Sequence, residues 1–278
     1  MTRKLGVAHL TAIDLAPAAF IESAARAGFD HVGLRLLRVT GTSPGYPLMD
    51  DPAAMRETRR AMAATGLTVH DIEFVRITPE TEPASLGAFL DAGAELGASQ
   101  VICAPYDPDL HRLAERLAAL SSLAAGRGLG IALEFFPWTV VPDLATAIRV
   151  TVAAGEKVGI LVDSLHFDRS GSTLDQLRHV PPARLPFAHL ADAMVQPSYS
   201  EAELLHTARD ERLPPDEGQI DLRDFLAALP KDLPVSVEVP MSAFAAAEGN
   251  DAVLRRVARA SRQLLSRSEA DDQEPGLR

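Results

Sequence analysis

Residues 129–163, LGIALEFFPWTVVPDLATAIRVTVAAGEKVGILVD, contain the repeating unit of this chain. Two short apolar runs, 129–135 and 158–163, flank a longer segment that ends at Gly155, a residue type that favours the end of a helix. The order strand, helix, strand is typical of parallel strands joined by helices. Each apolar run carries an acidic residue at or near its end, Glu134 in the first and Asp163 in the second.

The same alternation extends over the chain and gives eight strands. The other six predicted strands are 4–9, 30–37, 67–75, 99–104, 185–190 and 234–239. Helical segments rich in Ala, Leu, Arg and Glu lie between them, among them 17–27, 51–65, 84–97 and 109–125. Doubly wound sheets share this local pattern, so the number of predicted strands, eight, is what favours a barrel over such a sheet. We therefore predict an α/β protein, a (β/α)8 or TIM barrel, built as a single domain.

The predicted barrel covers residues 1–265, and two segments depart from its pattern. Residues 193–219 follow the seventh strand and are too long and too polar for a plain connection. We expect an extended loop there that covers the substrate. Residues 266–278 show no apolar periodicity, and we expect them to form a disordered tail.

Composition excludes several classes of function. The chain has 38 acidic and 27 basic residues, a formal charge of −11, and this field argues against nucleic acid as a partner. The three lysines, Lys4, Lys157 and Lys231, lie before or at the start of predicted strands, which disfavours a Schiff-base mechanism. A lone Cys103 excludes an internal disulfide. No apolar stretch approaches the roughly 18 residues of a membrane span, and no signal peptide is evident, so we expect no membrane partner and a cytoplasmic location.

The last four predicted strands each carry an ionisable residue near the carboxyl end. These residues are Glu134, Asp163, His189 and Glu238. Side chains at these ends converge on one mouth of a TIM barrel, and buried carboxylates need a cation or a donor to compensate them. Three carboxylates and one imidazole match the ligand preferences of a divalent metal ion. We predict one such ion, Mn²⁺ first, with Mg²⁺, Co²⁺ or Zn²⁺ as alternatives.

A wider set of motifs is similar to that of the xylose isomerase-like TIM barrel superfamily, with the sugar phosphate isomerase/epimerase family as its nearest branch. The residues that carry the resemblance are Glu134, Asp163, His166, His189, Asp192 and Glu238. The resemblance extends from Leu5 to about Leu265. It implies that Glu134 and Glu238 are both metal ligands and acid/base groups, and that an enediolate forms when a proton is removed beside a carbonyl. Reprotonation then gives epimerisation or isomerisation, and loss of a β-hydroxyl gives dehydration.

Substrate-binding residues are less clearly marked. His166 lies just beyond the sixth strand, where it either contacts a substrate oxygen, as a catalytic residue, or caps a helix. Epimerases of the family carry an arginine six residues after the strand-seven histidine, but Val195 stands there, which weakens a ketose 3-epimerase assignment. Arg209 or Arg212 of the extended loop could replace that arginine, and Arg169 is another candidate anchor.

Four further residues belong to the candidate pocket or to its support. His70 and Glu73 lie on strand 67–75, where strict alternation prevents all its polar residues from facing the mouth, and we assign His70 to the pocket. Arg35 is costly to bury without an anion, so it meets either a structural carboxylate, with Glu73 a candidate, or the substrate. Trp138 either stacks on a sugar or belongs to the core.

The sequence thus predicts a metal-dependent isomerase or epimerase of a monosaccharide or keto-polyol. A dehydratase of an inosose or dehydroshikimate-like compound on the same metal site is the alternative. An endonuclease-type relative would need additional His ligands and a basic face, and a non-catalytic sugar-binding barrel has no need of Glu134 and Glu238. The expected partner is a small sugar or polyol, and a homo-oligomer is compatible with the sequence.

Overall fold

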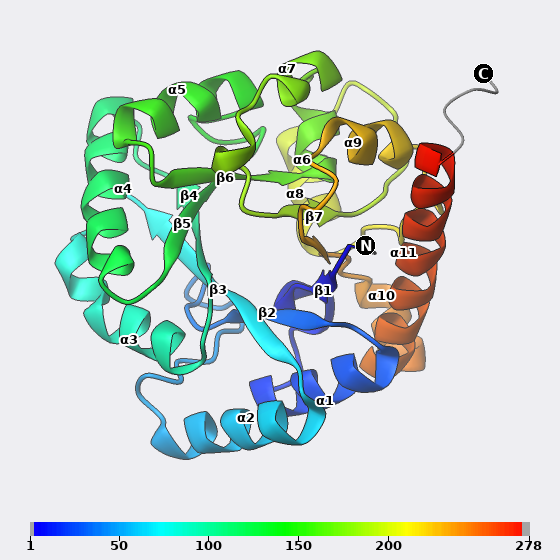
Figure 1. The fold of residues 1–278 in the computed structure, drawn as a ribbon, viewed down its shortest axis with the longest axis horizontal. Helices are drawn as coiled ribbons and strands as arrows, with labels where there is room; N and C mark the ends of the chain where they lie inside the picture. The colour runs from blue at the N-terminus through cyan, green and yellow to red at the C-terminus, as the bar shows by residue number, and fades with distance from the viewer. Residues whose placement is uncertain (1–2, 274–278) are drawn as a thin grey trace.

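The computed structural model describes residues 3–273 and shows a closed barrel of eight parallel strands, in the order β1 to β8 around the barrel (Figure 1). The strands are β1 Leu5–Val7, β2 His31–Arg35, β3 Thr68–Ile77, β4 Gln100–Pro105, β5 Gly130–Glu134, β6 Val158–Asp163, β7 Ala188–Leu190 and β8 Val235–Val237. The prediction of a (β/α)8 barrel is confirmed, and every predicted strand is present.

Helices surround the strands in a ring (Figure 1). The α-helices are α1 Pro17–Ala27, α2 Pro52–Thr65, α3 Gly87–Glu95, α4 Leu110–Ala125, α5 Leu144–Ala154, α6 Ser164–Arg169, α7 Leu174–Arg178, α8 Glu201–Arg209, α9 Leu222–Ala228, α10 Ser242–Glu248 and α11 Asn250–Gln273. Short 3₁₀ helices are η1 His9–Ala12, η2 Pro83–Leu86 and η3 Pro182–Arg184. Within residues 3–273, none of these helices combines the length and the apolar character of a membrane span.

Local sequence explains where the helices begin and end. The side chains of Asp51, Asp109 and Asp143 accept hydrogen bonds from backbone N–H groups at the starts of α2, α4 and α5. Gly28 and Gly66 end α1 and α2 in the left-handed conformation that glycine adopts without strain. The last two strands, β7 and β8, are shorter than predicted. Prolines lie close to their ends, and proline has no N–H group for a strand ladder.

Strand β3 departs from strict alternation at two places. Its register against β2 shifts between Val32 and Gly33, and its register against β4 shifts between Ile72 and Val75. Each shift places an extra residue in β3, so that two consecutive side chains face the barrel interior. The first inward pair is His70–Asp71 and the second is Glu73–Phe74. The expectation that alternation would exclude one of His70 and Glu73 from the interior was therefore wrong.

Asp71 lies inside the barrel and is fully buried. A Cβ atom at Gly33, the residue that faces it on β2, would lie 2.4 Å from Asp71 Oδ1, so glycine is needed there to make room. Neither carboxylate oxygen of Asp71 has a hydrogen-bond partner among the described residues. The barrel interior thus contains a polar layer, centred on β2 and β3, below the carboxyl ends of the strands.

The two segments that depart from the barrel pattern differ from expectation in detail. Residues 193–219 contain helix α8. A capping box formed by Ser200 and Glu203 stabilises the start of this helix. The predicted disordered tail starts at residue 266, but α11 continues to Gln273. Leu264 and Leu265 are buried on α11, and Arg267 pairs with Asp216 at 2.7 Å, which stabilises this last part of the helix. Residues 274–278 lie outside the described residues.

Candidate metal centre and pocket

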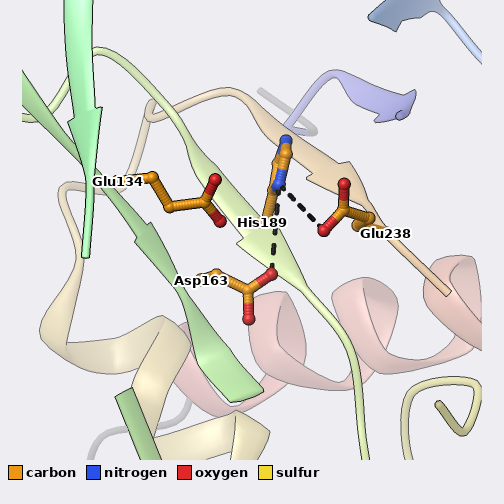
Figure 2. A group of neighbouring side chains, drawn as sticks. All are labelled: Glu134, Asp163, His189 and Glu238. Carbon is orange, nitrogen blue, oxygen red and sulfur yellow. Dashed lines mark ion pairs between the residues drawn. The ribbon is translucent and has the colours of Figure 1, made fainter. Parts of the chain in front are cut away.

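Four side chains from neighbouring strands converge at the carboxyl ends of the barrel strands (Figure 2). Glu134 and Asp163 end β5 and β6, His189 lies on β7, and Glu238 directly follows β8. Backbone pairing places Asp163 opposite His189. One ligand atom from each residue lies within 4.8 Å of all the others, and all four residues are buried. The structure therefore brings together the four residues that the sequence predicts as metal ligands.

The geometry of this cluster fits a divalent ion. His189 Nδ1 lies 4.0 Å from Asp163 Oδ2 and 4.0 Å from Glu238 Oε2. Two ligand atoms at about 2.0–2.2 Å from one ion lie at most about 4.4 Å apart, so only small adjustments are needed. Both ring nitrogens of His189 and Glu134 Oε1 are buried without a hydrogen-bond partner among the described residues. Buried polar atoms normally have partners, and an oxygen-rich set with one imidazole suits a divalent metal.

Electrostatics distinguish the two acidic residues at the ends of β5 and β6. Burial raises the pKa of Glu134 well above its usual range, and the neighbouring carboxylates of Glu238 and Asp163 raise it further. Burial also opposes ionisation of Asp163, but Arg212 and two nearby histidines outweigh it and lower the pKa of Asp163 to about 2. Two backbone N–H groups at the start of α6 donate to Asp163 Oδ1 at 2.8 and 3.2 Å. Asp163 is therefore held as a carboxylate.

Two buried arginines lie against Glu238. Arg212 Nη2 donates to Glu238 Oε2 at 2.7 Å, and Arg212 Nη1 donates to Asp163 Oδ2 at 2.7 Å. Arg35 Nη2 lies 3.9 Å from Glu238 Oε1 and donates to Glu73 Oε2 at 3.2 Å. The structural partner expected for Arg35 is thus Glu73, and Arg35 also lines the pocket.

His166 faces the opposite side of the cluster. Its Nε2 lies 3.7 Å from Glu134 Oε1, and its ring meets Phe136 and Trp138 edge-on at centroid distances of 4.7 and 5.3 Å. Burial lowers the pKa of His166 to about 4, so the imidazole is neutral near pH 7. The Nδ1 atom is buried without a partner among the described residues. A neutral imidazole here can donate a hydrogen bond to a bound molecule or accept one from it.

A pocket of about 370 Å³ opens directly above these residues. This volume lies in the range of small-molecule sites. Its inner wall is formed by Arg35, Phe74, Tyr106, Glu134, Phe136, Trp138, His166, Arg212 and Glu238. Its outer wall comes from Leu10, Ile13, Asp14, Val39, Thr40, Thr42, Ser43, Pro44, Ala208, Arg209, Asp210 and Ser242. Ala208, Arg209, Asp210 and Arg212 belong to segment 193–219, so part of this segment lies against the pocket.

Two predicted substrate-binding residues lie elsewhere. His70 is absent from the described residues that line the pocket. Its ring contacts His31 and Phe187 inside the barrel, because His70 lies near the start of β3, far from the carboxyl end of the strand where the pocket opens. Arg169 also lies outside the pocket lining. Its guanidinium donates to Met194 O at 2.7 Å and stacks over Tyr199 at 4.1 Å, so it holds the extended segment.

Some pocket residues were not identified from the sequence. Tyr106 directly follows β4, and its place at a strand end was a usable signal. Phe74 enters the pocket through the second register shift of β3, which periodicity does not reveal. Val39, Thr40 and residues 42–44 reach the outer wall from the connection after β2, and no motif marks them. Trp138, which was predicted, lines the pocket and donates from Nε1 to Tyr106 Oη at 3.4 Å.

Comparison with known proteins shows the family of this chain. A family model described as xylose isomerase-like TIM barrel matches residues 21–264. An inosose isomerase of Bacillus velezensis is 32% identical over 119 residues, and one of Bacillus licheniformis is 31% identical over 134 residues. These matches cover 42% and 47% of this chain, and the chain spans less than half the length of either relative, 40% and 45%.

A solved structure of the IolI protein, described with a bound zinc atom, superposes with a TM-score of 0.79. It is 19% identical in sequence, and the match covers 95% of this chain and 99% of that chain. This likeness concerns the fold, whereas the family model covers most of the sequence. The chain therefore belongs to the xylose isomerase-like TIM barrel family.

Proposed function

We propose that this protein is a metal-dependent isomerase or epimerase of a monosaccharide or keto-polyol. The observation that carries the proposal is the convergence of Glu134, Asp163, His189 and Glu238 beneath a pocket of small-molecule size. The relatives named inosose isomerase support a cyclic keto-polyol as the first substrate to test. We propose Mn²⁺ as the ion, with Mg²⁺, Co²⁺ and Zn²⁺ as alternatives, since oxygen ligands outnumber the single imidazole.

A bound divalent ion would supply a Lewis acid that polarises a carbonyl and makes the neighbouring C–H group more acidic. The residues of this chain would do the remaining work. Glu134 and Glu238 each have a carboxylate in the pocket, so one can remove a proton from the substrate and the other can return one. Passage through an enediolate then changes the configuration of one carbon or moves the carbonyl to the next.

The pocket walls suggest how a substrate would be oriented. His166 and Arg35 each line the pocket and each have a buried nitrogen without a partner among residues 3–273, Nδ1 in His166 and Nε in Arg35. We propose that they bind substrate oxygens on the Glu134 side and the Glu238 side. Trp138 provides an apolar face on which a sugar ring can stack. The segment that carries Arg212 would exclude water from the inner pocket.

The test combines metal analysis with hydrogen exchange. Protein purified without chelator is analysed for its metal content, then loaded with Mn²⁺ and incubated in deuterium oxide with an inosose and a panel of keto-sugars. An isomerase or epimerase incorporates deuterium at the carbon beside the carbonyl, whereas a dehydratase releases water and gives a product 18 mass units lighter, about the mass of one water molecule. A protein that binds the ion but causes neither exchange nor elimination on any compound would contradict an enzymatic role.

A further inference from the structure

Arg212 lies within the cluster of candidate ligands and not merely beside it. Its side chain is 1% exposed, and each of its three guanidinium nitrogens donates a hydrogen bond. Two of them bind Asp163 and Glu238, and Nε donates to Ala208 O at 3.0 Å. A buried guanidinium that holds two carboxylates in this way fixes both in orientation, because the fork of donors is planar and rigid.

The oxygens that Arg212 holds are the ones that face His189. Asp163 Oδ1 accepts two backbone hydrogen bonds, so Oδ2 is the oxygen left for an ion. Asp163 Oδ2 and Glu238 Oε2 are both bound by Arg212 and both lie 4.0 Å from His189 Nδ1. An ionised carboxylate oxygen has more than one lone pair, so it can accept an N–H group and bind an ion at the same time.

The charges of the buried groups are compatible with this sharing. With all three carboxylates ionised, as ligands of an ion must be, they and the Arg212 guanidinium leave a formal charge of two negative units, which a divalent ion neutralises. Arg35 is balanced by Glu73, its partner at 3.2 Å. The guanidinium therefore does not need to leave when an ion enters, and it limits the repulsion among the carboxylates before the ion arrives.

Arg212 also connects the cluster to the backbone of segment 193–219. Its own N–H group donates to Pro240 O at 2.8 Å, just after β8. The next residue, Leu213, exchanges two backbone hydrogen bonds with Asp192, just after β7, at 2.8 and 2.9 Å. The outer pocket residues Ala208, Arg209 and Asp210 directly precede this anchored point. The position of Arg212 thus determines both the ligand oxygens and part of the pocket wall.

We propose that Arg212 is a positioning residue of the metal centre, which holds the ion-facing oxygens of Asp163 and Glu238 and couples ion binding to the order of segment 193–219. This inference rests on the proposed metal-dependent function. Coupling of this kind is reciprocal: if Arg212 links the two sites, an ion at the centre stabilises the segment. Residues that orient metal ligands typically contribute about 10- to 100-fold to metal affinity.

The experiment compares the wild-type chain with Arg212→Gln, Arg212→Lys and a matched control, Arg184→Gln. Arg184 donates from Nη1 to three backbone carbonyls near the start of β6 and lines no part of the pocket among the described residues. Each protein is titrated with Co²⁺, and affinity and the visible absorption spectrum are recorded. Limited proteolysis within residues 193–219 is then measured with and without Co²⁺.

We expect Arg212→Gln to bind Co²⁺ about 10- to 100-fold more weakly, with an altered spectrum. Arg212→Lys should resemble it, because one ammonium cannot hold two carboxylates as a fork does. Co²⁺ should slow proteolysis of the segment in the wild type and in Arg184→Gln but not in the Arg212 variants. If Arg212→Gln does not fold, the Lys variant gives the same readouts.

The outcomes separate the two proposals. Failure of the wild type to bind Co²⁺ would contradict the proposed function as well as the positioning role. Normal wild-type binding with an unchanged affinity and spectrum in the Arg212 variants would overturn the positioning role alone. Full recovery of affinity and spectrum by lysine would show that charge is sufficient, and it would also overturn the role assigned to the guanidinium fork.

Discussion

Replacing Asp71 by Asn should make the protein more stable, and increasingly so as the pH rises. Burial raises the pKa of Asp71 well above its usual range, the carboxylates of Glu73 and Glu238 raise it further, and Arg35 only partly offsets them. The native state therefore keeps a proton on Asp71 that the unfolded chain releases near its ordinary pKa of about 3.9.

The sign and size of the effect follow from this difference in proton binding. Between the unfolded pKa and the raised native pKa, the native state binds one proton more than the unfolded state, so stability falls as the pH rises. The fall is about 1.4 kcal/mol per pH unit for one proton. From pH 5 to pH 7 the wild type should lose up to about 2.7 kcal/mol from Asp71, and Asp71→Asn should lose none of it.

Urea unfolding at pH 5, 6 and 7 measures this difference. Both proteins are unfolded in the presence of a chelator, because an ion bound to the native state would add its own pH-dependent stabilisation. Asp50→Asn is the matched control, since Asp50 is exposed. A free-energy difference between Asp71→Asn and wild type that stays constant over this pH range would refute the reasoning, since it would mean that the buried carboxyl group is ionised.

Three further predictions concern the site and the core. Glu238→Gln should preserve the fold, because glutamine has the same shape, and should reduce turnover by about 100-fold or more; normal exchange of deuterium into the substrate would disprove an acid/base role. His189→Ala should first weaken metal binding, measured by elemental analysis after dialysis, and full metal occupancy would exclude His189 as a ligand. Burial raises the pKa of the Cys103 thiol, so the native protein should not react with a maleimide, whereas the urea-unfolded protein should; rapid labelling of the native state would show that β4 opens.

The sequence predicts the barrel and the metal cluster for the same reason. Parallel strands repeat with one helix between them, and their carboxyl ends meet at one mouth of the barrel. A residue at the carboxyl end of a predicted strand is therefore expected at that mouth. Glu134 and Asp163 end consecutive strands, and the structure places them in one cluster with His189 and Glu238.

Other features depend on tertiary structure that periodicity does not contain. The second register shift in β3 turns Phe74 as well as Glu73 inward, so Phe74 was missed. His70 faces the interior, but it lies too near the start of β3 to line the pocket. The path of segment 193–219 determines that Arg169 binds its backbone while Arg212 enters the cluster. The continuation of α11 beyond residue 265 depends on its packing and on an ion pair formed by Arg267.

The parallel pairing of β1 with β8 has a consequence for how the protein is made. Leu5 pairs with Val235, so a contact between the first strand and the eighth closes the barrel. Such a contact forms slowly because a long loop must be closed, and a growing chain cannot form it until the eighth strand has left the ribosome. Glu238 follows that strand directly, so the fourth candidate ligand reaches the cluster only when the barrel closes. A nascent barrel that lacks the eighth strand therefore cannot hold an ion as the complete barrel would.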